Sequence, residues 1–486
     1  MVTITHEQPA VASEGCVRIG AGGPSLRIRL PRHVVGAEGS DALEWRARTT
    51  ADAGDVETEY VSGPLRAVVQ HDLSESAWRL RASLTTTSDD PVSVSSVLLE
   101  VDPADGRAWV WGARAAGLVV LVTAGGELWG FSLRRGTLTL DRGEVVWLDT
   151  GTTIEPGRRH VLELVGRRCR GWGEVASLLP AWLPVMAVRG DEPVDLALPD
   201  AGVVAAGCTI LEGTDGTEIR GDGIQHASVR GGFGEVDLEL AFALALVDAV
   251  DGAAREVARL VREEPDTVLP ADTTTPAGRS RALERTARRL VVLQAARSLE
   301  AADIAGGWLL AGVTDLLETG GTAGPFTVAA LAGEAQRRDD PEVLAALAAA
   351  LTGVEAEAGM VLALTRVWAV LWGLGQDPEP VRQALARVLA QPVRTGLEAV
   401  ERALVTGDGA ATAELMAVLG AGLPGTPIPV PQPWEAAYAV ALTSLATGDD
   451  AAGPPLVQAA EMVARRLTAA HHGDPDVLAW LLLGER

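Results

Sequence analysis

Residues 235–264 read EVDLELAFALALVDAVDGAAREVARLVREE, and the hydrophobic pattern changes within this stretch. Apolar and acidic residues alternate with a period of two in EVDLELAFA (235–243), which is typical of a strand with one buried face. From residue 251 onward the apolar residues recur every three or four positions, as on one face of a helix. The stretch therefore marks the boundary between a β-rich and an α-rich part of the chain.

On the N-terminal side of this boundary, at least a dozen strands are predicted between residues 20 and 245. Segments such as SLRIRLP (25–31), RAVVQHDL (66–73) and AWRLRASLTTTS (77–88) are rich in Val, Thr and aromatic residues, and several alternate with a period of two. The turn-forming triplets AGG, RRG, EPG and TDG separate such segments. So many antiparallel strands in one unit predict a β-supersandwich with two broad facing sheets over residues 1–250.

On the C-terminal side, Ala and Leu recur with helical spacing, and short Gly-, Asp- and Pro-containing breaks interrupt the pattern. No fixed sequence period is present, which disfavours a regular solenoid. We interpret residues 251–280 as a linker with a lead-in helix and residues 281–486 as an all-α, (α/α)-toroid-like domain, so the fold class is α+β multidomain. The predicted helices lie near 251–265, 277–302, 309–318, 325–338, 341–352, 356–374, 378–390, 393–406, 409–420, 433–446, 453–471 and 474–484.

The composition excludes several functions. The formal net charge is −24, which argues against a general nucleic-acid partner and against adhesion to anionic membranes. The sequence contains no Lys and no Asn, so all 41 basic residues are Arg. A Schiff-base Lys, a phosphate-binding P-loop Lys and a catalytic Asn are therefore impossible.

Cysteine and histidine usage points to a protein without a metal site. The three Cys are widely spaced, and neither a CxxC pair nor an HExxH motif occurs. The first residues contain no basic segment followed by an apolar one, and no apolar run is long enough for a bilayer. These observations predict a cytoplasmic protein that needs neither a metal nor an organic cofactor.

Two segments of the helical half resemble a known group of enzymes. RLVVLQAARSLEAADIAGGWLLAGVTDLLETGG (289–321) is similar to a first toroid helix and the loop that follows it, and PWEAAYAVALTSLATGDDAAGPPLVQAAEMVARRL (433–467) is similar to a late stretch in which a Glu precedes a helix. Together with the domain order, they resemble the glycoside hydrolases and phosphorylases that join a β-supersandwich to an (α/α)6 toroid. Bacterial glucoamylase-like enzymes are the best-known members of this group.

The resemblance implies a pair of catalytic carboxyl groups, which cleavage of a glycosidic bond requires. Glu435 matches the group's catalytic base, and Glu355 or Glu357, which precede a long apolar helix, would match its acid. Asp315 and Glu318, at a helix end, are candidates for substrate binding. The alternative for all five residues is a structural one, in which acidic side chains at helix ends interact with the helix dipole or with solvent.

Tryptophan side chains are the candidates for stacking against sugar rings. In the helical half these are Trp434, Trp308, Trp368 and Trp372, of which the last two are four residues apart and share a helix face. In the β half, Trp109 and Trp111 share a strand face and form a possible platform with Trp129 and Trp147. Core packing is the alternative for every one of them.

Three function classes follow. The first is a carbohydrate-active enzyme of glucoamylase-like architecture that acts on an oligosaccharide or glycoconjugate through paired carboxyl groups. The second is a catalytically inactive glycan-binding or scaffold relative, which is favoured because residues 322–340 lack the group's Trp- and Arg-rich sugar-gripping segment. The third is a terpene-type cyclase, which is disfavoured because only RDDPEV (338–343) partly resembles an Asp cluster for metal and diphosphate. The sugar, the linkage and the oligomeric state stay open.

Overall fold

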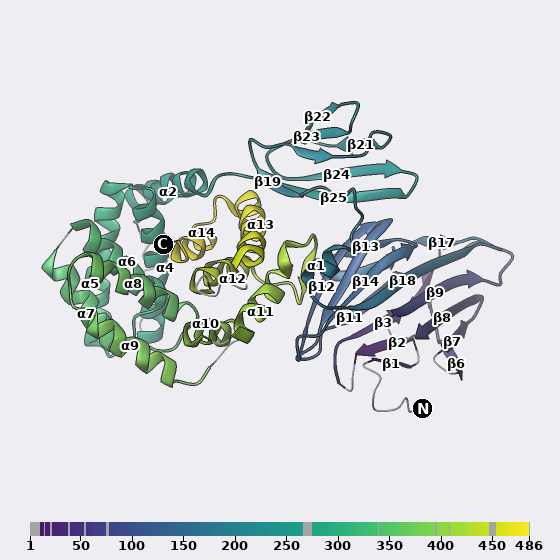
Figure 1. Ribbon diagram of the computed structural model, residues 1–486, viewed down its shortest axis with the longest axis horizontal. Helices are drawn as coiled ribbons and strands as arrows, with labels where there is room; N and C mark the ends of the chain where they lie inside the picture. Colours follow the sequence, from purple (N-terminus) through teal and green to yellow (C-terminus); the bar gives the residue numbers. More distant parts are fainter. Residues whose placement is uncertain are drawn as a thin grey trace.

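The computed structural model describes residues 10–13, 15–19, 22–36, 39–52, 55–73, 77–265, 275–338, 340–393, 396–407, 409–446 and 453–485. Mostly antiparallel sheets form the N-terminal part of the chain and helices form the C-terminal part, which confirms the predicted fold class (Figure 1). Strand β25 (Gly234–Ala243) is followed directly by helix α2 (Leu246–Glu263). The change of hydrophobic period therefore coincides with the change of secondary structure.

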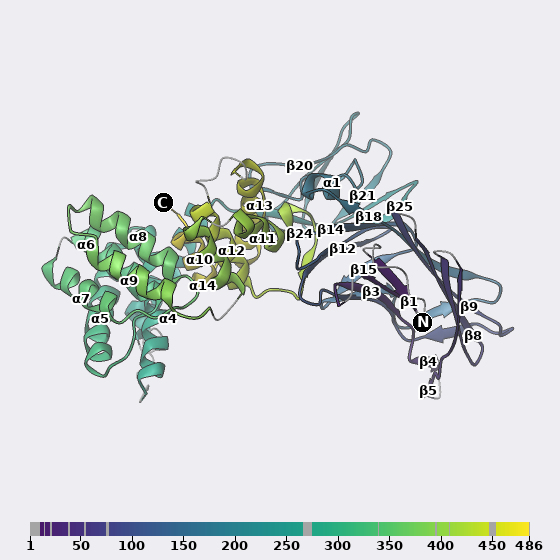
Figure 2. The same ribbon diagram turned by 60° about the horizontal axis from the view of Figure 1, so that its bottom comes forward.

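One 15-stranded antiparallel sheet dominates the N-terminal part. Its strands, in spatial order, are β1 (Ala10–Ser13), β2 (Cys16–Ile19), β3 (Ser25–Arg29), β11 (Val97–Asp102), β16 (Glu144–Leu148), β15 (Leu138–Asp141), β12 (Arg107–Arg114), β13 (Ala116–Val122), β14 (Leu128–Arg135), β18 (Arg159–Cys169), β9 (Ala77–Thr86), β8 (Leu65–Leu73), β7 (Asp55–Ser62) and β6 (Arg46–Asp52), with β26 (Thr426–Ile428) beside β12. The sheet curves strongly, so side chains from its two ends meet in one core on the concave face (Figure 2). The expected two facing sheets are thus largely one continuous sheet folded over.

Three smaller sheets complete this part. The first adds to the concave core and contains β17 (Thr152–Ile154), β10 (Val92–Val94), β4 (His33–Gly36) and β5 (Gly39–Ala42). The other two pack on the outer face of the large sheet, where short helix α1 (Trp172–Ala176) also lies. One of them contains β19 (Ala187–Arg189), β25, β24 (Gly223–Gly231) and β21 (Gly202–Ala205). The other contains β20 (Val194–Leu196), β23 (Thr217–Arg220) and β22 (Thr209–Glu212).

The central strands of the large sheet are buried on both faces. In β12, Ala108 and Val110 point into the concave core, whereas Trp109 and Trp111 point to the outer sheets. All seven residues of β13 are buried. This double burial explains why AGLVVLV (116–122) reads as a continuous apolar run instead of an alternating one.

The helices form two layers that alternate along the chain. Six inner helices pack side by side, and α14 returns to α4, so the described helices close into a ring. The inner helices are α4 (Pro276–Ala295), α6 (Pro325–Arg338), α8 (Met360–Gly373), α10 (Gly396–Thr406), α12 (Pro433–Ala446) and α14 (Pro475–Leu483). The outer helices are α2, α5 (Leu299–Glu318), α7 (Pro341–Thr352), α9 (Glu379–Ala390), α11 (Gly409–Val418) and α13 (Gly453–His471). A single turn of 3-10 helix, η1 (Gly420–Gly422), follows α11.

Helix boundaries follow local signals in most places. Side chains of Thr275, Asp340 and Asp474 accept hydrogen bonds from backbone N–H groups in the first turns of α4, α7 and α14, and a Pro follows each cap. The predicted helix 277–302 is wrong in its extent, because α4 ends at Ala295 and α5 begins at Leu299. Arg297 lies between the two helices and has a positive φ of 56°, which interrupts the helical backbone conformation. Residues 266–274 of the predicted linker lie outside the described residues.

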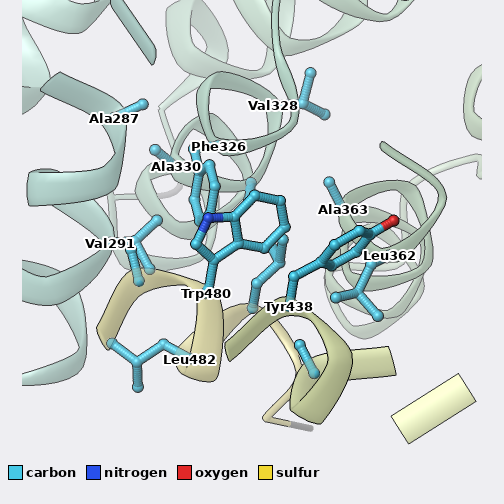
Figure 3. Close-up of a cluster of buried hydrophobic side chains, with 14 of the residues drawn as sticks. Ala287, Val291, Phe326, Val328, Ala330, Leu362, Ala363, Tyr438, Trp480 and Leu482 are labelled. Atoms are coloured by element: carbon cyan, nitrogen blue, oxygen red, sulfur yellow. The ribbon is translucent and has the colours of Figure 1, made fainter. Parts of the chain in front are cut away.

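A cluster of buried hydrophobic side chains, which includes Phe326, Tyr438 and Trp480, packs between helices of the ring (Figure 3). Trp480 of α14 lies 4.8 Å from the ring of Phe326 and 4.6 Å from that of Tyr438, centroid to centroid. The three side chains come from α14, α6 and α12, which are far apart in sequence. Their contacts tie the C-terminal end of the chain into the ring.

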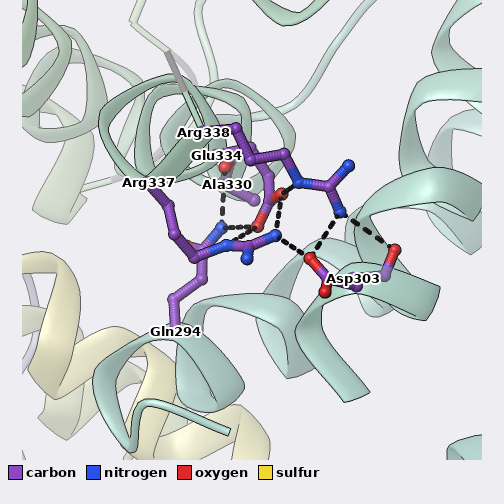
Figure 4. Close-up of polar contacts among 6 residues, drawn as sticks. All are labelled: Gln294, Asp303, Ala330, Glu334, Arg337 and Arg338. Carbon is purple, nitrogen blue, oxygen red and sulfur yellow. Dashed lines mark hydrogen bonds and ion pairs between the residues drawn. The ribbon is translucent and has the colours of Figure 1, made fainter. Parts of the chain in front are cut away.

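A buried carboxylate joins three helices near the end of α6 (Figure 4). Glu334 is fully buried and accepts hydrogen bonds from Gln294 of α4, at 2.9 Å, and from Arg337, at 2.7 Å. Arg338 forms a second ion pair with it, at 2.8 Å, and both arginines also pair with Asp303 of α5. Since each charge in this network has a partner, the buried carboxylate is stabilised.

Among the described residues, no helix combines the length and the apolarity that a bilayer crossing requires.

Candidate functional site

A short segment between α11 and α12, which contains β26, connects the ring to the large sheet. β26 pairs with β12 in antiparallel register, with Trp109 opposite Pro427. The indole N–H of Trp109 donates to the backbone carbonyl of Pro424, at 2.9 Å, and Arg107 pairs with Glu414 of α11. These contacts place the ring beside the outer face of the central strands.

A cleft of about 910 Å³ lies next to this junction. One wall consists of β12, β24 and β25, and the other consists of α12, α13 and the segment that contains β26. Ala358, Gly396 and Pro433, which lie just before or at the N-terminal ends of α8, α10 and α12, also line it. One end of the ring therefore opens towards the sheet.

The consecutive residues Trp434 and Glu435 line this cleft from the first turn of α12. Trp434 is 39% exposed and stacks on Trp480, with 5.9 Å between ring centroids. The Oε2 atom of Glu435 accepts a hydrogen bond from the backbone N–H of Gln432, at 2.8 Å. Glu435 therefore closes the first turn of the helix, as the structural alternative expects, and it also lines the cleft.

The sheet contributes polar side chains from β24 and β25. His226 lies directly opposite Glu239 in the ladder between these strands, and both line the cleft together with Asp237. Asp237 pairs with Arg114, with 2.6 Å between Oδ2 and Nε. Glu239 thus supplies a carboxyl group that faces the helical wall.

Helix α13 contributes a cation to the same cleft. The Nη1 atom of Arg466 donates to the backbone carbonyls of Leu423 and Gly425, at 3.2 and 3.5 Å. Burial lowers the pKa of Arg466, and the negative charge of Glu239 partly opposes this effect. His471, five residues further along α13, lines the cleft as well.

The two candidates for the catalytic acid lie near the cleft but outside its lining. Glu355 and Glu357 are exposed and lie in the loop between α7 and α8. The neighbouring Ala358 reaches the cleft. Glu357 lies close enough to the buried Glu284 for its charge to raise the pKa of that carboxyl group.

The other predicted binding residues do not line the cleft. On α5, Asp315 pairs with Arg279 at 3.0 Å, Glu318 is exposed at the helix end, and Trp308 packs partly buried against the helical core. On α8, Trp368 and Trp372 are 37% and 72% exposed. Trp372 lies twelve residues after the start of α8, which corresponds to about 18 Å along the helix axis.

The predicted platform of four tryptophans in the β half is not formed. Trp109 and Trp111 face the outer sheets and line the cleft with part of their surface. Trp129 and Trp147 lie in the concave core on the opposite face of the large sheet. All four are at least nine-tenths buried, so their main role is packing.

Two buried carboxyl groups hold the same end of the ring together. Glu284 of α4 accepts hydrogen bonds from the N–H groups of Phe326 and Thr327, at 2.7 and 3.0 Å, at the start of α6. Glu401 of α10 accepts a hydrogen bond from the N–H of Leu362 at the start of α8, at 2.8 Å. It accepts another from the hydroxyl of Tyr438 of α12, also at 2.8 Å. Burial raises the pKa of each to about 7.

The sequence contains no signal for these two roles. A helix cap is normally supplied by the residue that precedes the helix. Here the acceptors come from other helices, about forty residues away along the chain. Because backbone and hydroxyl donors occupy the carboxylate oxygens of Glu284 and Glu401, these two carboxyl groups are structural.

No group of three or more His, Cys, Asp or Glu side chains suited to a metal ion occurs in the part of the chain that the structure describes. Of the RDDPEV segment, Asp340 caps α7 and Asp339 lies outside the described residues.

No protein-family profile matches the sequence, and no curated protein matches it. Among solved structures, the chain is similar to a polysaccharide lyase, with 11% identity, a TM-score of 0.48, and coverage of 90% of this chain and 74% of that one. It is also similar to a mutant of a glycoside hydrolase of family 81 from Clostridium thermocellum, with 10% identity, a TM-score of 0.21, and coverage of 85% and 66%. Neither description names a glucoamylase. Both TM-scores lie below 0.5.

Proposed function

We propose that the cleft binds an oligosaccharide and that Glu435 acts there on a glycosidic bond. The observation that supports this proposal is the position of an exposed Trp434 beside Glu435 in a cleft of about 910 Å³. An aromatic face binds the apolar face of a sugar ring, and a carboxyl group beside it binds or activates a hydroxyl group. The volume is at the upper end of the range that small-molecule sites occupy.

In the proposed reaction Glu435 acts as a general base. It takes a proton from a water molecule while the water oxygen attacks the anomeric carbon, and the glycosidic C–O bond breaks. A second carboxyl group donates a proton to the leaving oxygen. Glu357 or Glu355 is the proposed acid on the helical side, and Glu239 offers a carboxyl group on the sheet side.

A second candidate function is glycan binding without cleavage. It is favoured by the hydrogen bond that Glu435 already accepts from Gln432 and by the position of Glu355 and Glu357 outside the cleft lining. In this case Trp434 and the polar groups of the cleft bind the sugar, and no bond is broken.

Glu435→Gln is expected to reduce sugar release about a hundredfold, because an amide cannot accept the proton of the attacking water. Purified protein is incubated with α- and β-linked oligosaccharides, with and without phosphate, and released sugar is quantified. Dependence on phosphate identifies a phosphorylase. Glu357→Gln and Glu239→Gln, measured in parallel, identify the proton donor.

Glu342→Gln is the matched control for this variant. Glu342 also lies in the first turn of a helix, α7, but outside the cleft, so its substitution removes the same favourable interaction with a helix dipole. Equal release by wild type and Glu435→Gln rejects the catalytic role of Glu435. Binding without any release by the wild type supports the non-catalytic candidate.

Trp434→Ala is expected to weaken oligosaccharide binding about tenfold, because the stacking surface for one sugar ring is lost. The measurement is the dissociation constant by isothermal titration calorimetry, with the melting temperature as a check on folding. Trp372→Ala tests the exposed stacking position on α8. Loss of affinity in Trp372→Ala alone places the sugar on α8 and contradicts the proposal for the cleft.

A further inference from the structure

Arg466 interrupts an apolar stripe on helix α13. Val463, Leu467 and Ala470 line the cleft from one face of this helix, at the spacing expected for a buried helix face. Arg466 lies on the same face and lines the cleft with them. A charged side chain at such a position requires a partner or a function.

The guanidinium group of Arg466 is only partly satisfied. Its Nη1 atom donates to two backbone carbonyls, which are neutral acceptors. Within the described residues, its Nε and Nη2 atoms have no hydrogen-bond partner, and no carboxylate lies within ion-pair distance of the group. The charge in the cleft is therefore not neutralised at short range.

The other side chains of the cleft that Arg466 lines are mixed in charge. His226 and His471 line the same cleft and can donate hydrogen bonds to an anion. Of the cleft carboxylates, Asp237 is already paired with Arg114, and Glu435 accepts from Gln432. Glu239 interacts with Arg466 electrostatically from beyond ion-pair distance.

We infer that Arg466, with His226 and His471, binds an anionic group that the glycan carries, either the carboxylate of a uronic acid or a sulfate ester. This inference rests on the proposed function and specifies its substrate class. Two free N–H groups of a guanidinium match two oxygens of such an anion. A partly buried cation that has no carboxylate at ion-pair distance also gains more from an anion than an exposed one does.

The test compares neutral, uronate-containing and sulfated oligosaccharides of the same length by isothermal titration calorimetry. We expect the wild type to bind one anionic class at least about tenfold more tightly than the neutral one, as a charge-assisted hydrogen bond allows. Arg466→Gln is expected to remove this preference, so that anionic and neutral oligosaccharides bind the variant with equal affinity. The class that is preferred identifies the anion.

Two further variants separate charge from structure. Arg465→Gln changes the neighbouring arginine, which bonds the carbonyl of Ala187 and does not line the cleft, and it is expected to keep the preference. Arg466→Lys keeps the charge and is expected to retain part of the preference for the anionic oligosaccharide. The melting temperature of Arg466→Gln shows whether loss of the bonds to Leu423 and Gly425 disturbs the fold.

A second readout does not depend on oligosaccharide binding. Sodium glucuronate and sodium sulfate, added at constant ionic strength, are expected to shift the imidazole NMR signals of His226 and His471 in the wild type but not in Arg466→Gln. Equal affinities for neutral and anionic oligosaccharides overturn the inference and leave the proposed function standing. If no oligosaccharide binds, the proposed function fails, and the NMR shifts alone decide whether the anion site exists.

Discussion

Glu401→Ala is expected to lower the free energy of unfolding by about 4 kcal/mol. Glu401 is fully buried and connects α10 to the start of α8 and to Tyr438 of α12. Its removal leaves the backbone N–H of Leu362 and the hydroxyl of Tyr438 as buried donors without an acceptor. Each such group costs about 1–3 kcal/mol, and the cavity left by the side chain adds to this.

Glu401→Gln is the conservative comparison. The amide has the same shape and keeps one acceptor oxygen, so a loss of about 1–2 kcal/mol is expected. Glu379→Ala is the control, because it removes a helical Glu whose ion pair with Arg382 lies on the exposed surface. Such a pair contributes up to about 1 kcal/mol.

Unfolding in urea, followed by circular dichroism, measures all three variants. If Glu401→Ala unfolds at the same midpoint as Glu379→Ala, the contacts of Glu401 do not hold the ring together. A change in the slope of the transition for Glu401→Ala alone would indicate that part of the ring unfolds separately.

The division into a β part and a helical part was predictable, because it depends on local hydrophobic period alone. EVDLELAFA alternates and DGAAREVARLV does not, and the structure changes from strand to helix between them. The curvature of the large sheet was not predictable. It depends on pairings between strands such as β3 and β11, which are about seventy residues apart.

The closure of the ring and its buried carboxyl groups follow from distant contacts as well. Phe326, Tyr438 and Trp480 read as ordinary core residues in their own helices, and nothing local shows that they meet. Glu284 and Glu401 read as surface residues of amphipathic helices. Their burial becomes evident only when neighbouring inner helices present unpaired N–H groups to them.

The candidate site was predictable on one side only. Trp434 and Glu435 adjoin a Pro at a helix start, and they reach the cleft from there. His226 and Glu239 were missed, because their proximity results from strand pairing. Arg466 did have a local signal, since VARRL (463–467) places an arginine in line with Val463 and Ala470 on an apolar helix face.

His71 makes the stability of the β part sensitive to acid. Its side chain is 1% exposed in the concave core, beside the edge of Trp78, with 6.3 Å between ring centroids. Neither of its nitrogen atoms has a hydrogen-bond partner among the described residues. Burial lowers its pKa from 6.5 to about 4, so the folded protein keeps this imidazole neutral at pH 5.

The sign of the effect follows from proton binding. Between pH 6.5 and about 4 the unfolded chain binds a proton at His71 and the folded protein does not, so stability falls as the pH falls. The free energy of unfolding that is lost in this way amounts to about 3 kcal/mol at pH 4. Glu284 and Glu401, whose pKa values are raised to about 7, change stability in the opposite direction over this range, because their folded forms bind protons first.

The difference between wild type and His71→Leu isolates the histidine, because the contributions of the two carboxyl groups cancel. Leu fills a similar volume without a group that titrates, so the variant is expected to gain about 3 kcal/mol over the wild type between pH 7 and pH 4. Urea unfolding at several pH values measures this difference. His472→Leu, which removes an exposed histidine, is measured as the control. Parallel profiles of His71→Leu and wild type would show that His71 is protonated as readily in the folded protein as in the unfolded chain, and that the burial of its imidazole does not control the acid sensitivity of the sheet.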